Sequence, residues 1–210
     1  MRFFGADAPQ NDRGGESIEM SARTIIMTGE RGVGKTTVCQ RVVALAQAEQ
    51  GCTHRDVLTG MYPSTYTCGG LLTLAHPDGS RDVLDVGSGD ERRLTLPPNS
   101  DQGVVQGCFR FDPETLAWGN DVLSRILACD LLVVDELGPL EIKRGRGWVR
   151  AFDVLRDASF TLAIVVVRPE LVVQAQLRLP TSATTVFTVT LENRDSLPEG
   201  LVQILHGQEY

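Results

Sequence analysis

The segment Gly29-Glu-Arg-Gly-Val-Gly-Lys35-Thr36 decides how this 210-residue chain is interpreted. It matches the pattern G-x-x-x-x-G-K-[ST] at every fixed position. Glycines let the backbone curl so that successive N–H groups face one anion, and a following helix adds its positive N-terminal end. In such a loop the lysine reaches the β- and γ-phosphates of a nucleotide, and the hydroxyl after it binds Mg²⁺. We therefore predict a nucleoside triphosphate and Mg²⁺ as ligands.

The predicted contacts with the nucleotide cover the loop and the first turn of the helix after it. Lysine is rare in this chain, because only Lys35 and Lys143 are lysines among 20 basic residues. A lysine at the motif position therefore indicates a need for a compact point charge rather than a chance match. The residues that we expect to bind the nucleotide are Gly29, Glu30, Arg31, Gly32, Val33, Gly34, Lys35, Thr36 and Thr37.

The sequence around the loop predicts an α/β fold, with a mostly parallel sheet and helices on both of its faces. The apolar run Thr24–Met27 leads into the loop, and apolar residues recur at helical spacing from Lys35 to about Gln50. Downstream, apolar strands alternate with helical segments, which is the pattern of βαβ units. We expect strands at 104–111, 131–134, 162–167 and 185–189, and helices from Asp112 to about Cys129 and at 148–158, 170–177 and 198–206.

The length of the chain favours one domain, which we place over residues 22–210. Residues 1–21 are polar and glycine-rich with little periodicity, so we expect a disordered N-terminal tail. The turn signal His-Pro-Asp-Gly-Ser separates Leu71–Ala75 from Arg81–Val86. It predicts a β-hairpin insertion over residues 71–96.

Composition restricts the class of partner. The net charge of −7 argues against nucleic acid as the main partner, since a duplex-binding domain usually has a basic face. No stretch reaches the roughly 18 apolar residues of a membrane helix, and the first residues contain no apolar secretory core. The five cysteines include no C-x-x-C pair, so we expect reduced thiols and neither a zinc site nor a disulfide framework. We expect a cytoplasmic protein.

Two carboxylates follow the apolar run 131–134. At the carboxyl end of a central strand beside the strand of the phosphate loop, Asp135 would bind Mg²⁺ together with Thr36. Glu136, next to it, would polarise a water in line with the γ-phosphate, which is what hydrolysis requires. These positions predict a metal site at Thr36 and Asp135 and catalytic roles for Lys35 and Glu136.

At this point the sequence resembles a known family. The segment Gly29–Thr37, followed by Asp135-Glu-Leu-Gly-Pro-Leu-Glu141, is similar to the THEP-type nucleoside-triphosphatases, also called cancer-related NTPases. The similarity covers most of residues 23–210. It implies a P-loop NTPase fold and a Mg-dependent enzyme that converts NTP to NDP and phosphate with broad base tolerance. Glu141 matches the last acidic position of the family's second motif, without a role that the sequence defines.

One segment departs from that family. Its members carry arginines after the first helix, whereas residues 61–70 of this chain contain none. Another arginine would have to neutralise the transition state, a contribution worth about three to five decades in rate. Arg168, which follows the strand 162–167, is our principal candidate and is predicted to be catalytic. The others are Arg31 in the loop and the basic segment 143–147, whose glycines suit a mobile lid.

Two further functions stay open at this stage. A small kinase would transfer the γ-phosphate to a metabolite, although the adjacent Asp135 and Glu136 favour water as the acceptor. A slow nucleotide-dependent switch would act on a protein partner, with the 71–96 hairpin as its contact surface. Several aromatic residues could stack on the base, and these are Tyr62, Tyr66, Phe111 and Trp118.

Overall fold

The computed structural model describes residues 23–48, 66–180 and 184–208. The expected N-terminal tail, Tyr62 and half of the arginine-free segment 61–70, residues 61–65, lie outside these residues. No helix within the described ranges is both long enough and apolar enough to cross a membrane.

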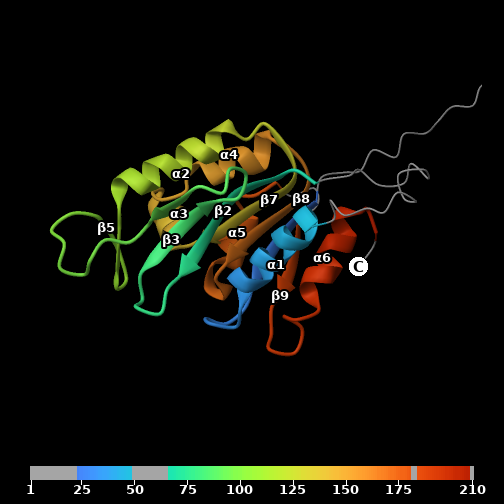
Figure 1. Ribbon diagram of the computed structural model, residues 1–210, viewed down its shortest axis with the longest axis horizontal. Helices are drawn as coiled ribbons and strands as arrows, with labels where there is room; N and C mark the ends of the chain where they lie inside the picture. The colour runs from blue at the N-terminus through green and yellow to red at the C-terminus, as the bar shows by residue number, and fades with distance from the viewer. Residues whose placement is uncertain (1–22, 49–65, 181–183, 209–210) are drawn as a thin grey trace, which may run out of the picture.

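A seven-stranded sheet forms the centre of the molecule, with the strand order β4-β3-β2-β7-β8-β1-β9 (Figure 1). The five strands from β2 to β9 pair in parallel, while β3 and β4 continue the sheet in antiparallel fashion. The mostly parallel α/β sheet predicted from the sequence is confirmed. Its strands are β1 (Arg23–Thr28), β2 (Cys68–Ala75), β3 (Arg81–Asp85), β4 (Glu91–Arg93), β7 (Ala128–Leu137), β8 (Ser159–Val167) and β9 (Thr184–Thr188).

Helices cover both faces of this sheet (Figure 1). On one face lie α1 (Lys35–Ala48) and α6 (Leu197–Leu205), which contribute to one hydrophobic cluster. The helices of the other face contribute to a second cluster, and they are α2 (Pro113–Arg125), α3 (Pro139–Arg144), α4 (Arg150–Asp157) and α5 (Val172–Gln176), the last preceded by the 3-10 turn η3 (Pro169–Leu171). Because both faces are covered, the central strands are apolar throughout.

The central strand β7 shows how one sequence serves both cores. Leu131 and Val133 pack into the cluster beneath α1 and α6, whereas Leu132 and Val134 pack beneath α2 and α4. All four side chains are fully buried. Successive side chains of a strand point to opposite faces, so an uninterrupted apolar run is needed here.

The hairpin predicted over residues 71–96 belongs to the main sheet. Its strand β2 pairs in parallel with β7, from Cys68 opposite Leu131 to Leu71 opposite Val134. Strands β3 and β4 then extend the sheet as its outer edge.

Three other local predictions need correction. The strand expected over 104–111 is a two-stranded hairpin, β5 (Val104–Gln106) and β6 (Phe109–Phe111), because Gly107 turns the chain at a φ of 61°. The loop expected at 143–147 begins inside a helix, since Lys143 and Arg144 end α3. The helix that follows Asp112 ends at Arg125 rather than near Cys129, which lies in β7.

The start of α2 agrees with the sequence signal. Asp112 precedes the helix, and its side chain accepts a hydrogen bond of 3.2 Å from the backbone N–H of Glu114. Pro113 occupies the first turn, where a missing N–H costs nothing.

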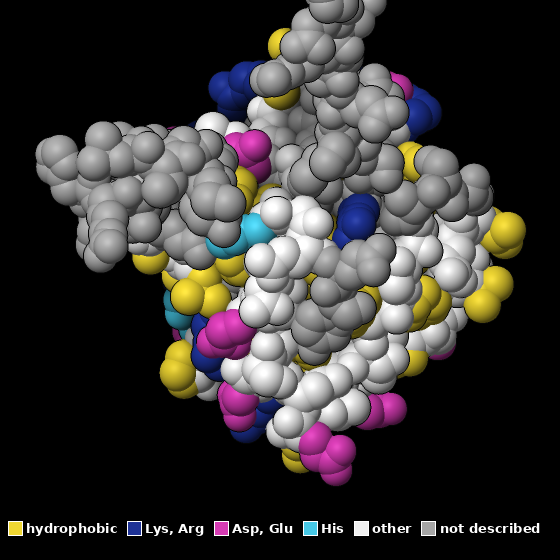
Figure 2. Space-filling view, turned by 90° about the vertical axis from the view of Figure 1, so that its right-hand side faces the viewer, with side chains coloured by type: hydrophobic (Ala, Val, Ile, Leu, Met, Phe, Trp, Pro, Cys, Tyr) yellow, Lys and Arg dark blue, Asp and Glu magenta, His cyan; other side chains and the backbone are white. Residues whose placement is uncertain are grey.

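The end of the molecule that lies at the right in Figure 1 faces the viewer in Figure 2. Basic and acidic side chains lie close together along its rim. Strand β1 runs from this end toward the lower edge of the view, where the blue loop that precedes α1 is found (Figure 1).

Candidate functional site

The loop from Gly29 to Gly34 joins β1 directly to α1. Gly29, Gly32 and Gly34 have φ values of 139°, 80° and 109°, a region that other residues rarely adopt. At Gly29 a side chain would also collide with the carbonyl oxygen of Val189. The backbone of the loop is therefore fixed in a shape that the glycines alone permit.

Lys35 lies at the centre of this loop. Its Nζ donates hydrogen bonds to the carbonyl oxygens of Gly29, at 2.6 Å, and Glu30, at 2.8 Å. The side chains of Glu30 and Arg31 are exposed around it, and Thr36 is half-buried behind it. The motif residues are thus arranged as the pattern predicts, with the positive charge inside the curl.

The strand that carries the acidic pair is not adjacent to β1. Strand β8 lies between them, which corrects the expected neighbourhood of Asp135. Met27 is in register with Val166, and Val166 with Asp135. Asp135 therefore reaches the same edge of the sheet as the loop, two strand spacings or about 10 Å from β1.

Asp135 is buried at this edge, with 2% of its surface exposed. The pKa of its carboxyl is raised to about 7, chiefly by burial; the nearby Glu136 carboxylate acts in the same direction, and a hydrogen bond from Thr36 acts in the opposite direction. Its Oδ2 atom has no hydrogen-bond partner among the described residues. A buried carboxylate oxygen without a partner beside a threonine hydroxyl fits a hard divalent cation that takes oxygen ligands.

Glu136 and Arg168 form an ion pair beside Asp135. The Nε atom of Arg168 donates to Oε1 of Glu136 at 2.7 Å, and both side chains remain partly exposed. Arg168 follows the last residue of β8, so the prediction that it lies at the edge of the phosphate loop is confirmed. The pair lines two adjoining pockets, one with Thr36 and Asp135 and one with Arg31 and Lys35.

The structure gives Glu141 a role that the sequence left undefined. Its carboxylate accepts hydrogen bonds from the backbone N–H of Gly138, at 2.8 Å, and of Trp148, at 3.0 Å. Burial raises the pKa of this carboxyl to about 7, although both hydrogen bonds lower it. Glu141 thereby fixes the turn that begins two residues after Glu136.

Sequence reasoning missed three residues of the site. Arg81, the first residue of β3, lines both pockets, and so do Gln106 and Phe109 of the β5–β6 hairpin. Arg81 lies there because β2 pairs with β7 and β3 pairs with β2, and the hairpin lies there because its strand β6 contacts Thr95 and Leu96. No motif in the sequence indicates the pairing of β2 with β7.

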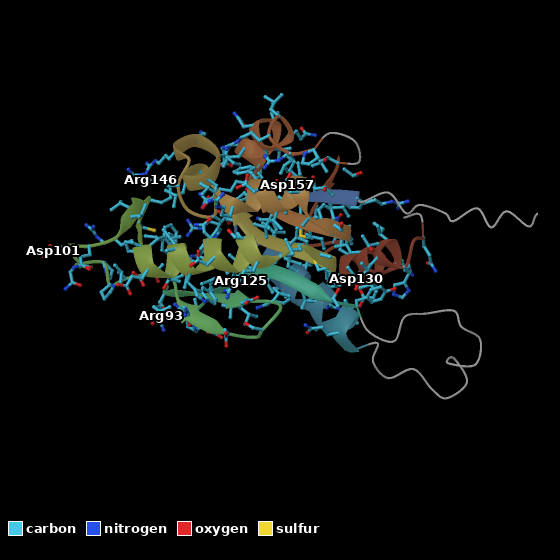
Figure 3. All side chains as sticks on the ribbon, turned by 90° about the horizontal axis from the view of Figure 1, so that it is seen from above. Arg93, Asp101, Arg125, Asp130, Arg146 and Asp157 are labelled. Atoms are coloured by element: carbon cyan, nitrogen blue, oxygen red, sulfur yellow. The ribbon has the colours of Figure 1, made fainter. Side chains whose placement is uncertain are left out.

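The remaining candidates are spread over the molecule. Phe111 lines the pocket with Asp135, whereas Trp118 lies 4.7 Å beneath the guanidinium of Arg92 and Tyr66 stacks on His206 before the start of β2. Of the basic segment, Arg144 donates to the carbonyl oxygen of Val105 at 2.9 Å, and Arg146 stands at the periphery of Figure 3. The structure does not bring this segment to the phosphate loop.

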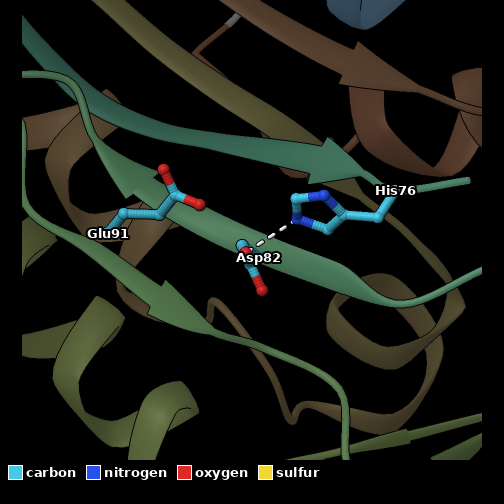
Figure 4. A group of neighbouring side chains, drawn as sticks. All are labelled: His76, Asp82 and Glu91. Atoms are coloured by element: carbon cyan, nitrogen blue, oxygen red, sulfur yellow. Dashed lines mark hydrogen bonds and ion pairs between the residues drawn. The ribbon is translucent and has the colours of Figure 1, made fainter. Parts of the chain in front are cut away.

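A second polar cluster lies on the sheet extension, where His76, Asp82 and Glu91 face one another (Figure 4). His76 Nε2 lies 2.7 Å from one carboxylate oxygen of Asp82, and Arg93 Nε lies 2.5 Å from the other. Both carboxylate oxygens of Asp82 are thus already paired, one with the His76 ring and the other with the Arg93 guanidinium. This cluster is therefore described as an ion-pair network.

Comparisons with known proteins identify one family. A family model described as NTPase matches residues 24–202. The nucleoside-triphosphatase THEP1 of Methanopyrus kandleri is 31% identical over 186 residues, which cover 85% of this chain and 93% of that protein. THEP1 of Caldivirga maquilingensis is 31% identical over 140 residues, covering 67% and 73%.

A solved structure gives the same fold. The crystal structure of THEP1 from the hyperthermophile Aquifex aeolicus matches with a TM-score of 0.57 and 19% identity, over 87% of this chain and 98% of that chain. The family model spans most of the sequence, and the match to the relative from Methanopyrus kandleri covers most of both chains. The chain therefore belongs to the THEP1-type nucleoside-triphosphatase family.

Proposed function

We propose that this chain hydrolyses nucleoside triphosphates to the diphosphate and phosphate, with Mg²⁺ as cofactor. The observation that carries the proposal is the position of Glu136, which lines the same pocket as Lys35 and directly follows the buried Asp135. A partly exposed carboxylate at that place can act on water, whereas a metabolite acceptor would call for a base placed on the acceptor itself.

Thr36 and Asp135 would hold the Mg²⁺ ion, a fit supported by the unpartnered Oδ2 atom of Asp135. When bound, the ion would neutralise phosphate charge. Lys35 would add a fixed positive charge at the β- and γ-phosphates, and the backbone N–H groups of the loop would orient them. Strand β8, which lies between β1 and β7, sets the distance between the phosphate loop and Asp135.

Glu136 would orient the attacking water and take its proton. Its ion pair with Arg168, at 2.7 Å, limits the rotation of the side chain and holds the carboxylate in the pocket. A cytoplasmic location is part of the proposal, and it is supported by Cys39, Cys68, Cys108 and Cys129, which are free thiols.

The first test is phosphate release from ATP, GTP, CTP and UTP with Mg²⁺. Glu136→Gln should reduce kcat by about 100-fold or more while nucleotide still binds, because the base is lost and the shape is kept. Lys35→Ala should reduce both turnover and binding. Asp121→Asn, an exposed change on α2, serves as the control and should behave like the wild type.

Turnover that survives both substitutions would refute the proposal. Tight nucleotide binding without turnover in the wild type would favour the two alternatives. Phosphate transfer that starts only with an added metabolite would identify a kinase. A nucleotide-dependent change in protease sensitivity of the hairpin would identify a switch that acts on a protein partner.

A further inference from the structure

Arg81 has a backbone held by two hydrogen bonds and a guanidinium that forms no hydrogen bond with the described residues, although its charge acts on the carboxyl of Asp135. Its backbone N–H donates to Oγ1 of Thr95 at 2.9 Å, and its carbonyl oxygen accepts from the N–H of Leu94 at 2.8 Å. No hydrogen bond or ion pair joins its guanidinium to any side chain or carbonyl in the described part of the chain. A half-buried arginine with unused donors is available to a ligand.

The surroundings of this guanidinium place it at the phosphate side of the site. It lies 4.6 Å from the ring centre of Phe109, which holds it by a cation–π contact. Arg81 lines one pocket with Thr36 and Asp135 and the adjoining pocket with Lys35 and Glu136. It comes from the β2 side of β7, whereas Lys35 comes from the β1 side.

The arginines that the sequence suggests for the transition state are engaged or exposed. Arg168 donates to Glu136, and Arg144 donates to the carbonyl oxygen of Val105. Arg31 lines the second pocket but is exposed on the loop. Arg81 therefore combines what the others lack: a fixed backbone, partial burial and free donors across the pocket from Lys35.

We propose that Arg81 is a catalytic residue that binds the γ-phosphoryl group and stabilises it as the charge on its oxygens shifts. The proposal rests on the hydrolysis proposed above. In that reaction the water oxygen bonds to the γ-phosphorus, the bond to the β–γ bridging oxygen breaks, and Glu136 takes the proton of water. Arg81 donates hydrogen bonds to the transferred oxygens, from the side opposite Lys35. A planar guanidinium suits this task because its paired N–H groups match phosphate oxygens.

The test compares Arg81→Ala, Arg81→Gln and Arg81→Lys with Arg92→Ala. Arg92 is a matched control, since its guanidinium also covers an aromatic ring, at 4.7 Å from Trp118, but it lines neither pocket. Removal of Arg81 should reduce kcat by about 100-fold to 1,000-fold, near the lower end for a transition-state arginine. Arg81→Lys should recover part of this loss, and Arg92→Ala should leave kcat unchanged.

A binding measurement separates a catalytic role from a structural one. Binding of a non-hydrolysable triphosphate should weaken by no more than a few fold in Arg81→Gln, whereas binding of the diphosphate with aluminium fluoride, which resembles the transferred group, should weaken about as much as kcat falls. Unchanged kcat in folded Arg81→Ala or Arg81→Gln would overturn the proposal. So would a loss of kcat that higher Mg²⁺ restores, since Arg81 would then act through Asp135.

Failure of the two proposals gives different results. If Lys35→Ala and Glu136→Gln stop turnover and Arg81→Gln does not, only the role of Arg81 is wrong. If Glu136→Gln has full activity, the hydrolytic mechanism itself is wrong. Phe109→Leu, which keeps an apolar side chain and removes the ring, should reduce kcat by less than Arg81→Gln does, because the guanidinium is then less well held.

Discussion

At the scale of single residues, Asp135 combines burial with a charge. Its carboxyl has an ordinary pKa of 3.8, which burial in the folded chain raises to about 7. The folded state therefore binds a proton more tightly than the unfolded state. The stability that this proton gives is complete below the unfolded pKa and is lost as pH rises from about 4 through about 7. The ionised carboxylate of Asp135, which suits a bound cation, therefore destabilises the folded protein when no cation is bound.

Asp135→Asn should accordingly stabilise the protein at pH 8 and in the absence of Mg²⁺ and nucleotide. Removal of the buried charge should be worth on the order of 1–4 kcal/mol, which raises the Tm by several degrees. The difference between variant and wild type should shrink as pH is lowered toward 4. Thermal unfolding between pH 4 and pH 8 measures it. A variant that is less stable than the wild type at pH 8 would contradict this reasoning.

Glu141 and Gly147 depend on each other at the same scale. The Oε1 atom of Glu141 accepts the N–H of Trp148, and a side chain at Gly147 would collide with that oxygen. Gly147 also has a φ of 72°, and its carbonyl oxygen accepts a 2.7 Å hydrogen bond from Asn120. This glycine is required by space as well as by conformation.

Gly147→Ala should therefore cost more than its neighbour Gly145→Ala. Gly145 has a similar φ of 61° but open space around it, so its substitution should cost about 1–2 kcal/mol from backbone strain alone. The collision at Gly147 should add about 1–3 kcal/mol. Urea unfolding of both variants gives the comparison, and equal losses would show that Glu141 moves aside freely.

At the scale of elements, α2 packs through a glycine against Trp148, which lies just before α4. Gly119 lies on the buried face of α2, and a side chain there would penetrate the ring of Trp148. Gly in a helix interior normally costs about 0.5–1 kcal/mol relative to Ala. The ring of Trp148 fills the space that a side chain at position 119 would occupy, and its packing offsets this cost.

Gly119→Ala should consequently destabilise the protein, although helix propensity alone predicts the opposite sign. The gain of about 0.5–1 kcal/mol should be outweighed by overpacking of about 1–3 kcal/mol. Ala117→Gly, at an exposed position of the same helix, reports the propensity term separately. Chemical denaturation of the two variants decides the sign, and a more stable Gly119→Ala would show that Trp148 can shift at little cost.

Local signals explain which elements the sequence could predict. The glycine loop, the helix from Lys35 and the start at Asp112 are encoded by adjacent residues, and the structure has all three. The pairing of β2 with β7, the position of β8 between β1 and β7, and the split of 104–111 into two strands depend on contacts distant in sequence. The same division holds for the site. The motifs and strand ends predict the positions of five site residues: Lys35, Thr36, Asp135, Glu136 and Arg168. Arg81, in contrast, is brought to the site by the pairing of strands distant in sequence.

At the scale of the whole molecule, the two hydrophobic clusters share their strands. Leu131 belongs to one cluster and the adjacent Leu132 to the other, and both are completely buried. A strand cannot lose its packing on one face and keep its place in the sheet. The two layers should therefore unfold together.

Leu131→Ala and Leu132→Ala test this coupling. Each should lower the free energy of unfolding by about 2–5 kcal/mol, as buried leucines do, and each should retain a single transition. Circular dichroism and the fluorescence of Trp148 and Trp118, both on the α2–α4 side, should follow one curve. Separate midpoints in the Leu131→Ala variant would show that the α1–α6 layer unfolds by itself.

The two outer strands of the sheet differ in a way that affects the handling of the protein. Strand β4 is three residues long and entirely charged, Glu91-Arg92-Arg93, so its open backbone is a poor template for another chain. Strand β9, Thr-Thr-Val-Phe-Thr, has no charge, and no described strand pairs with its outer side. Backbone N–H and C=O groups along such a strand can accept a further strand from a neighbouring molecule. Aggregation of concentrated or heated samples should accordingly begin at β9, and a lysine in place of Val186 is the change that would suppress it.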